Sequence, residues 1–318
     1  MKNIYLNIYK PNSINLKKAK KNVESNNIIG LPTETVYGLA GNAYSDKSVK
    51  KIFTLKKRPI FNPLIIHFKN LNELKKNVLL NHNFLKLYRA FCPGPITFIL
   101  KKKAKSKISK IAIARKETIA VRIPKHKVAQ SLLNILNFPL AVPSANIASK
   151  LSPTSAKDVV DEFGSKIKFI LNGGQSQIGL ESTIIDLTGN PTILRPGSIT
   201  VKKIKKVLKQ RIQIKKKLKI IKSPGQFKLH YSPGIPVLMN KKYPKNNEAF
   251  ITFGKKFKDS KNYFNLSKNG SLKEAANNLY RTMRKIKKKN FKSISVTRIP
   301  NIGIGSAINE RLKKASSK

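Results

Sequence analysis

The chain of 318 residues has few of the residues that build several common kinds of site. Its single cysteine, Cys92, excludes an internal disulfide framework and a cysteine-based zinc site. The four histidines, at positions 67, 82, 126 and 230, lie too far apart in sequence to form a local metal motif. Only 14 residues are Asp or Glu, which disfavours a hydrolase built on paired carboxylates.

Long apolar segments are also missing. No run reaches 18 apolar residues, so we expect no membrane span. The N-terminal residues Met1-Lys2-Asn3-Ile4-Tyr5 do not begin a signal peptide, so secretion is not expected. The hydrophobic content of 40% is too high for a disordered chain, and the length suits two domains. We therefore expect a soluble cytoplasmic protein.

The charge is strongly one-sided, with 66 Lys and Arg residues and a formal net charge of +52. Most of these residues are Lys, they spread along the whole chain, and they accompany many Asn and Ile residues. This pattern indicates compositional drift more than one selected patch. An RNA site would combine basic residues with exposed aromatic residues for stacking, and no such interleaving stands out. We expect mostly solvated surface, with non-specific RNA contact that salt weakens.

Short apolar runs alternate with helical patterns over the first two-thirds of the chain, which predicts an α/β fold with a sheet and flanking helices. The predicted strands are residues 28–31, 64–68, 96–100, 119–123, 140–142, 168–171, 183–187 and 192–194. Ser13, Ser45 and Thr154 are predicted to cap helices, the last of which ends at Gly164.

The last third of the chain predicts a second, smaller α/β unit. Strands are expected at residues 236–239, 249–253 and 293–297, and Ser271 to Glu274 should form a capping box that opens a helix. The Lys-rich segment between the units predicts a short helix and an extended linker. The predicted divisions are residues 9–202, a linker at 203–234, and residues 235–318.

Familiar nucleotide-binding and hydrolase motifs are absent or incomplete. Gly174 and Gly179 have the glycine spacing of a P-loop, but the Lys and the Ser or Thr that should follow are missing. Gly303 and Gly305 lack the third glycine of a dinucleotide-binding fingerprint. The chain also has no Gly-x-Ser-x-Gly elbow.

Polar residues instead gather at the ends of predicted strands, where open α/β sheets bind ligands. Arg122 interrupts the strand at 119–123, and a buried Arg needs a carboxylate from the protein or from a ligand. Because acids are scarce, a ligand carboxylate is a fair hypothesis. Arg58 and Arg195 each lie beside a proline, and the three arginines together predict a pocket for an anionic, phosphorylated ligand. His67 lies in another strand, where it is either a core residue or a ligand contact.

A series of short motifs in fixed order resembles the threonylcarbamoyl-AMP synthase family, the YrdC-domain enzymes, in its long two-domain form. The matching pieces are Pro32-Thr33-Glu34-Thr35-Val36-Tyr37-Gly38-Leu39, Lys56-Lys57-Arg58-Pro59, Asn62-Pro63-Leu64, Pro93-Gly94-Pro95-Ile96-Thr97, Val121-Arg122-Ile123-Pro124, Pro143-Ser144-Ala145-Asn146, Ser152-Pro153-Thr154, Gly179-Leu180-Glu181-Ser182-Thr183, Leu194-Arg195-Pro196-Gly197, His230-Tyr231-Ser232-Pro233 and Ile308-Asn309-Glu310-Arg311-Leu312. Each piece alone is weak, but together they cover nearly the whole chain.

The resemblance implies a YrdC-like twisted mixed sheet joined by the linker to a smaller Rossmann-like domain. It also implies a nucleotidyltransferase that makes threonylcarbamoyl-AMP from L-threonine, bicarbonate and ATP, with Mg²⁺ on the phosphates and no metal site of the protein's own. The product would pass to a transferase that modifies an adenosine beside the anticodon of tRNA. The alternatives are an RNA-binding or nucleotide-binding protein without catalysis, and a carbamoyl-transfer maturation enzyme, which the single cysteine excludes.

The same resemblance implies roles for individual residues. The residues that would hold L-threonine are Thr35, His67, Arg122, Ser182 and the backbone of Val142. The residues that would hold ATP are Arg58, Asn62, Thr118, Ser144, Ser152, Arg195 and Tyr231. The catalytic set implied by the family signature is Lys56, Arg58, Ser144 and Asn146. Because Tyr231 belongs to the linker, we expect the linker to fold over the pocket as a lid.

Overall fold

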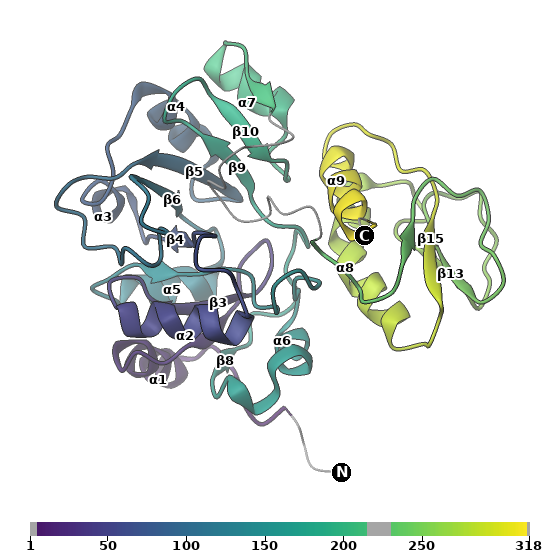
Figure 1. The fold of residues 1–318 in the computed structure, drawn as a ribbon, viewed down its shortest axis with the longest axis horizontal. Helices are drawn as coiled ribbons and strands as arrows, with labels where there is room; N and C mark the ends of the chain where they lie inside the picture. The colour runs from purple at the N-terminus through teal and green to yellow at the C-terminus, as the bar shows by residue number, and fades with distance from the viewer. Residues whose placement is uncertain (1–4, 215–229, 317–318) are drawn as a thin grey trace.

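The computed structural model describes residues 5–214 and 230–316, which form a large and a small α/β unit (Figure 1). The sheet of the large unit has eleven strands in the order β1-β8-β2-β3-β7-β4-β6-β5-β9-β10-β11. Its neighbouring strands are parallel in some pairs, such as β4 with β6, and antiparallel in others, such as β5 with β6. The predicted mixed α/β sheet is therefore confirmed.

Most elements of the large unit are short. Its strands are β1 (Ile8–Tyr9), β2 (Ile29–Leu31), β3 (Gly38–Asn42), β4 (Ile65–His67), β5 (Ile96–Lys101), β6 (Thr118–Arg122), β7 (Leu140–Ala141), β8 (Ile170–Leu171), β9 (Thr183–Asp186), β10 (Thr192–Arg195) and β11 (Gln213–Ile214). Its helices are α1 (Ser13–Glu24), α2 (Asp46–Lys56), α3 (Leu71–Leu74), α4 (His82–Phe91), α5 (Lys127–Asn134), α6 (Ala156–Phe163), η1 (Gly164–Lys166) and α7 (Val201–Leu208).

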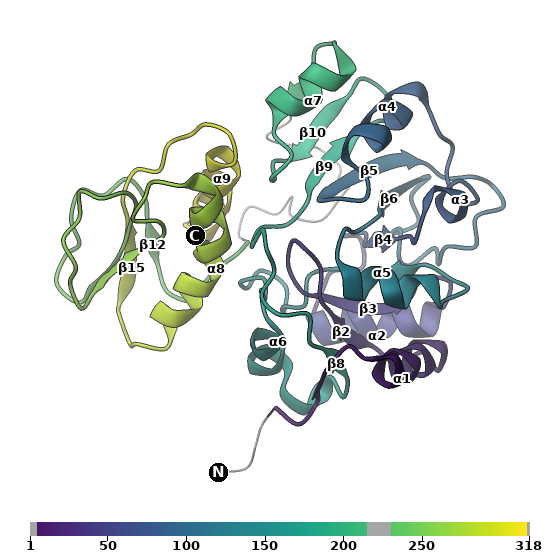
Figure 2. The same cartoon turned by 180° about the vertical axis from the view of Figure 1, so that it is seen from behind.

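Helices cover both faces of the large sheet. Ala19 and Val23 of α1 pack with Leu132 of α5 in one core cluster. The apolar residues of α2, α4, α6 and α7 belong to a separate and larger cluster. Figures 1 and 2 show α2 and α5 on opposite sides of the strands. Loops at the strand ends are therefore left free to form a site.

The small unit is a parallel sheet in the order β12-β15-β13-β14. Its elements are β12 (Val237–Leu238), β13 (Glu248–Thr252), β14 (Tyr263–Asn265), α8 (Leu272–Lys287), β15 (Ser293–Val296) and α9 (Gly305–Ala315). Both views place α8 and α9 between this sheet and the large unit (Figures 1 and 2). Val36, Leu151 and Leu180 of the large unit belong to the core cluster of the small unit, so the two units share apolar packing.

Two of the predicted helix starts need correction. Asn12, not Ser13, accepts the hydrogen bond from the backbone N–H of Asn15 at the start of α1. Ser155, not Thr154, caps α6, and Asp158 completes a capping box there, since it reaches the N-cap backbone. The predictions for Ser45, Gly164 and Ser271 are confirmed. However, the capping box at Ser271 is incomplete because the Glu274 carboxylate accepts from Ser267 instead.

All the predicted strands are present, with ends shifted by one or two residues. The elements that sequence reasoning missed are β1, β3, β11, β14, α3, α4, α5, η1 and α9. Strand β3 carries two glycines, which disfavour strands. It forms because α2 packs closely on it: a Cβ at Gly41 would lie 2.4 Å from Ser48 Oγ. The predicted linker begins inside α7, and its residues 215–229 lie outside the described part of the chain. No helix among the described residues is both long and apolar enough to cross a membrane.

Candidate active site

A cavity of about 40 Å³ lies at the end of β6 that carries Arg122. Of the predicted site residues, the cavity is lined by Thr35, Arg58, His67, Arg122, Val142, Ser144, Ser182, Arg195 and Tyr231. These residues come from the ends of several strands, a loop after β7 and the linker. The sheet and the linker thus bring together side chains that the sequence keeps far apart.

The strand register explains why these positions meet. β4 is parallel to β6, and His67 pairs with Arg122 in that register. β5 runs antiparallel to β6 but parallel to β9, so the start of β9 returns to the same edge of the sheet. Ser182 directly precedes β9, and its Oγ lies 2.7 Å from Thr97 Oγ1. The hydroxyl of Ser182 is thereby fixed beside the end of β6.

Arg122 has a carboxylate partner within the protein. Its Nη2 atom lies 2.8 Å from Oε1 of Glu34, and both side chains are buried. Of the two hypotheses that the sequence left open, the structure therefore supplies a protein carboxylate. Yet Nε and Nη2 of Arg122 make no hydrogen bond of regular geometry among the described residues. The guanidinium, which has five N–H donors, keeps the capacity to bind a second anion on the cavity side.

His67 is neutral in this environment. Burial, and then the charge of the adjacent Arg122, lower the pKa of His67 well below its usual value. Its Nδ1 has no hydrogen-bond partner in the part of the chain that the structure describes. An uncharged imidazole beside a guanidinium can hydrogen-bond to a ligand without competing for its negative charge.

Arg58 is held rigidly by carbonyl and amide oxygens. Its Nε donates to Asn62 O at 2.9 Å, and its Nη2 donates to Asn62 Oδ1 at 2.6 Å and to Pro63 O at 2.9 Å. The prolines at positions 59 and 63 restrict the backbone of this loop. Asn62 itself does not line the cavity, so its evident role is to aim Arg58.

Arg195 faces the same cavity. Its Nε donates to Ser182 O at 3.0 Å and its Nη2 to Ser182 Oγ at 3.1 Å. Burial, and then the neighbouring Arg195 charge, lower the pKa of Arg58 to about 9, so the Arg58 guanidinium stays cationic at neutral pH. Two buried guanidiniums repel one another, and an anion between them would relieve that repulsion.

Lys56 and Asn146 do not line the cavity. The buried Lys56 Nζ donates to Ser144 O at 2.5 Å and also to Asn146 O. Burial, and then the charge of Arg58, lower the pKa of Lys56 well below its usual value. The Asn146 amide donates to Ile147 O at 2.7 Å and to Lys150 O at 3.0 Å. Both residues therefore brace the loop that presents Ser144.

Ser152 and Thr118 also lie outside the cavity lining. Ser152 is buried and its hydroxyl donates to Glu181 Oε1 at 2.5 Å. Thr118 begins β6, four residues and therefore about 13 Å from Arg122 at the other end of the strand. Its position lends no support to an ATP contact in this structure.

The described end of the linker closes the cavity. His230 and Tyr231 both contribute to the lining, and Tyr231 is only 1% exposed. The Tyr231 ring stacks on Tyr280 with ring centroids 5.8 Å apart, and the Arg311 guanidinium lies 5.1 Å from the Tyr231 ring centre. The remaining space holds roughly three waters and is too small for a nucleotide.

A charged network joins the small unit to the site. The Glu181 carboxylate accepts from Arg311 Nε at 2.8 Å and from Tyr280 Oη at 3.1 Å, as well as from Ser152. Burial would raise the pKa of Glu181, but the charges of Arg311 and Arg195 and the hydrogen bonds from Ser152 and Arg311 lower it to about 2. Tyr280 of α8 and Arg311 of α9 thus hold Glu181, which directly precedes the cavity residue Ser182.

Sequence reasoning missed Glu34, Glu181, Tyr280 and Arg311 as structural parts of this site. The helical spacing of the sequence around Arg311 could have predicted that this side chain is buried. It shares one helical face with Ala307, Ile308 and Leu312, and a cation in an apolar stripe indicates a buried partner. No comparable periodic signal marked Glu34, which lies in a loop.

Among residues 5–214 and 230–316 no cluster of three or more His, Cys, Asp or Glu side chains could hold a metal ion. The cavity instead offers three guanidiniums, hydroxyls and a neutral imidazole. This combination suits a ligand that carries a carboxylate and phosphates.

Comparisons with known proteins agree with this chemistry. Residues 21–197 match the family described as "Telomere recombination", and residues 199–317 match "Threonylcarbamoyl-AMP synthase, C-terminal domain". The threonylcarbamoyl-AMP synthase of Pyrococcus abyssi is 35% identical, over 92% of this chain and 92% of the relative. That of Bacillus subtilis is 33% identical, over 96% of this chain and 94% of the relative.

A solved structure extends the similarity to the whole fold. The crystal structure of the Pyrococcus abyssi protein complexed with L-threonine superposes with a TM-score of 0.90 at 32% identity, and 97% of each chain is covered. The motifs, the two-unit fold and the full-length matches lead to one conclusion: this chain belongs to the threonylcarbamoyl-AMP synthase family, in the form that carries the C-terminal domain.

Proposed function

We propose that this chain makes L-threonylcarbamoyladenylate from L-threonine, bicarbonate or CO₂, and ATP, with release of pyrophosphate. The observation that carries the proposal is the convergence of Arg58, Arg122 and Arg195 on one cavity. The names of the relatives support it, and so does the L-threonine bound to the Pyrococcus abyssi protein.

In this proposal L-threonine lies against the end of β6. Its carboxylate binds the cavity side of Arg122 in a bidentate fork. Thr35, the neutral His67, the Ser182 hydroxyl and the backbone of Val142 contact the rest of the amino acid. All of these residues line the cavity.

ATP occupies the side of the cavity between Arg58 and Arg195. These guanidiniums and Ser144 offset the phosphate charge, and Tyr231 contacts the nucleotide from the linker. Asn62, Lys56 and Asn146 act behind them by fixing Arg58 and the loop of Ser144. Mg²⁺ arrives with the nucleotide as part of the substrate.

The chemistry proceeds by addition and then displacement. The threonine amine adds to CO₂, or to bicarbonate with loss of water, and loses a proton, which gives a carbamate. A carbamate oxygen then attacks the α-phosphorus, and pyrophosphate leaves with the electrons of the broken P–O bond. Catalysis relies on positioning and on the three guanidiniums, which stabilise the charge on the phosphates. The product passes to a transferase that modifies tRNA.

The described end of the linker, at His230 and Tyr231, acts as a lid over this cavity. Because the space beneath Tyr231 is too small for a nucleotide, the segment around Tyr231 moves to admit ATP. When it closes, it shields the carbamate and the mixed anhydride from water.

The proposal is tested by measuring pyrophosphate release from the purified chain with ATP, Mg²⁺ and bicarbonate, with and without L-threonine. Release that needs both L-threonine and bicarbonate is the expected result. Folded protein that binds ATP but shows no threonine-dependent release would instead indicate a nucleotide-binding or RNA-binding protein without catalysis.

Replacing Tyr231 with phenylalanine separates packing from nucleotide contact. The Tyr231 hydroxyl has no hydrogen-bond partner among the described residues, so its loss should not lower the free energy of unfolding. If the hydroxyl contacts ATP, KM for ATP should rise about fivefold, since one hydrogen bond contributes about 1 kcal/mol. Steady-state kinetics and urea unfolding check both values. An unchanged KM for ATP would contradict a nucleotide contact through this hydroxyl.

A further inference from the structure

We propose that Glu34 is a positioning residue that orients the Arg122 guanidinium toward the carboxylate of the amino-acid substrate. This inference rests on the proposed function, because it takes the L-threonine carboxylate as the ligand of Arg122. Glu34 would act from behind Arg122 and would not touch the substrate.

The loop after β2 directs Glu34 away from the cavity. Thr33 and Thr35 line the cavity, whereas Glu34 between them does not. Thr33 Oγ1 donates to Val36 O at 2.6 Å and lies 2.9 Å from Thr35 Oγ1, which makes the turn compact. The two threonines therefore face the ligand space while the Glu34 side chain extends to Arg122.

The backbone of this turn is also anchored from outside. The N–H of Ile178 donates to Glu34 O at 2.9 Å, and the Ser176 hydroxyl donates to Thr33 O at 3.0 Å. Asn277 of α8 in turn donates to Ser176 O at 2.7 Å. Glu34 is thus set on a rigid support, as a residue that fixes another side chain must be.

The ion pair is buried on both sides. The side chains of Glu34 and Arg122 are 6% and 5% exposed, with the closest N and O atoms 2.8 Å apart. Neither Glu34 oxygen accepts a hydrogen bond of regular geometry among the described residues. A buried carboxylate with so few other contacts needs the Arg122 charge to offset its own, and the Arg122 guanidinium likewise needs the carboxylate. Each side chain therefore restricts the orientation of the other.

The pairing leaves Arg122 suited to a second carboxylate. Glu34 is paired with one guanidinium nitrogen, Nη2, and the neutral His67 on the neighbouring strand adds no positive charge that would compete with Arg122 for the substrate carboxylate. Without Glu34, the guanidinium could turn toward the phosphates near Arg58 and Arg195. A guanidinium that is already fixed loses less side-chain freedom when the substrate binds.

The test compares two ligands that differ only at the carboxylate. Dissociation constants for L-threonine and L-threoninamide are measured by calorimetry at one pH, for the unchanged chain and for Glu34→Gln. The unchanged chain should bind L-threonine at least about tenfold more tightly than the amide. Glu34→Gln should bind L-threonine about tenfold more weakly and the amide within twofold of the original value.

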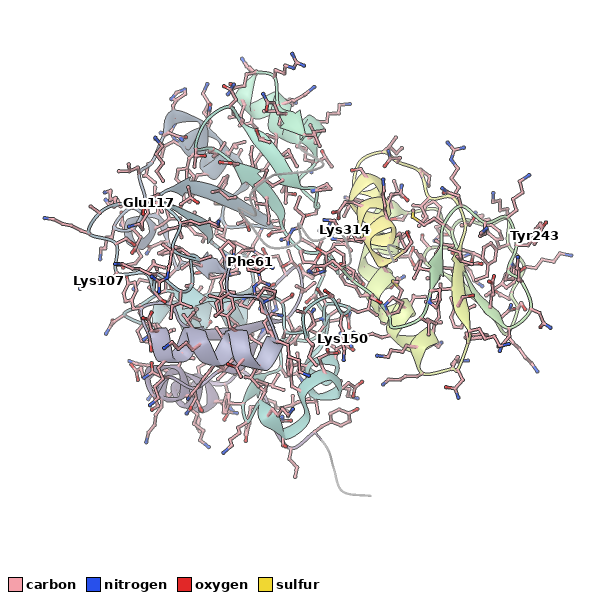
Figure 3. All side chains as sticks on the ribbon, in the orientation of Figure 1. Phe61, Lys107, Glu117, Lys150, Tyr243 and Lys314 are labelled. Carbon is pink, nitrogen blue, oxygen red and sulfur yellow. The ribbon has the colours of Figure 1, made fainter. Side chains whose placement is uncertain are left out.

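A matched control makes the same chemical change elsewhere. Glu117 is an exposed residue whose carboxylate lies 3.6 Å from Lys102 Nζ, at the edge of the large unit away from α9 (Figure 3). Glu117→Gln should leave both dissociation constants unchanged. If Glu34→Gln fails to fold, Glu34→Asp keeps the charge but draws the carboxylate back by one methylene. It should then weaken L-threonine binding about threefold and leave the amide unaffected.

The outcomes separate the two proposals. If the unchanged chain binds L-threonine and L-threoninamide with equal dissociation constants, the role of Arg122 in the proposed function is wrong. The role proposed for Glu34 is then wrong as well. If the unchanged chain distinguishes them and a folded Glu34 variant does so equally well, only the role of Glu34 is overturned. Equal weakening of both ligands in the variant would likewise indicate a merely structural residue.

Discussion

Replacing Arg122 with alanine is expected to lower kcat/KM for L-threonine at least about 100-fold. The change removes a bidentate contact to the substrate carboxylate, and each hydrogen bond to a charged group contributes about 1.5–3 kcal/mol. Threonine-dependent pyrophosphate release measures the effect. ATP binding, which the proposal assigns to Arg58 and Arg195, should change much less.

The same substitution leaves the Glu34 carboxylate buried without its cation, which costs about 3–5 kcal/mol of stability. Unfolding must therefore be followed alongside activity.

Two further variants separate stability from substrate binding. Arg122→Ala combined with Glu34→Gln removes the unpaired charge, and Arg122→Lys keeps a positive charge but not the two parallel N–H donors that bind a carboxylate. Arg89→Ala, at an exposed position of α4, is the matched control and should keep full activity. Threonine-dependent release that survives in a folded Arg122 variant would contradict the assignment.

Replacing Glu181 with glutamine is expected to destabilise the chain by about 3 kcal/mol near neutral pH. Glu181 is held by Arg311, Tyr280 and Ser152, and its loss leaves Arg311 buried with a weakened partner set. Because these contacts join α8 and α9 to the segment before Ser182, kcat/KM for L-threonine should fall as well. Urea unfolding and pyrophosphate release provide the two measurements.

The pH dependence of this effect has a definite sign. The folded-state pKa of Glu181, about 2, lies below the ordinary value of 4.5, although burial alone would raise it. The folded state therefore binds the proton less readily, and the stabilisation is fully present above about pH 4.5. It is lost as the pH falls toward 2, by about 3 kcal/mol in total.

Between pH 5 and 2 the unchanged chain should thus lose about 3 kcal/mol more of its free energy of unfolding than Glu181→Gln. Glu24→Gln is the control, since the Glu24 carboxylate lies 3.7 Å from Lys20 Nζ in an exposed pair. If the free energy of unfolding changes with pH in the same way for the unchanged chain and for Glu181→Gln, the Glu181 carboxylate has an ordinary pKa in the folded state.

The predictions that succeeded rest on local patterns. Apolar β-branched runs identified the strands on both sides of Arg122, and the proline-flanked segment identified Arg58. The predictions that failed depended on fine geometry. Asn12 and Ser155 cap their helices because their side-chain oxygens reach the right N–H group, and several nearby residues had equivalent side chains.

For the site, the sequence motifs identified most of the residues that line the cavity. They did not show which motif residues face the ligand and which support those residues from behind. Lys56, Asn62 and Asn146 belong to the same motifs as Arg58 and Ser144, yet they lie behind them and brace them. A motif indicates which residues occur together in a site. It does not predict which side chain faces the ligand, because that depends on strand register and loop conformation.

The sequence by itself determined the α/β class, the presence of three arginines at strand ends or beside prolines, and the family resemblance, because these follow from periodicity and from motifs within short stretches of chain. Only the tertiary structure decided that Glu34 is the partner of Arg122, that Arg311 and Tyr280 of the small unit hold Glu181, and that Tyr231 closes the cavity. Those contacts join residues from distant segments. Their pairing is fixed by the packing of sheets and helices against one another, which no local pattern specifies.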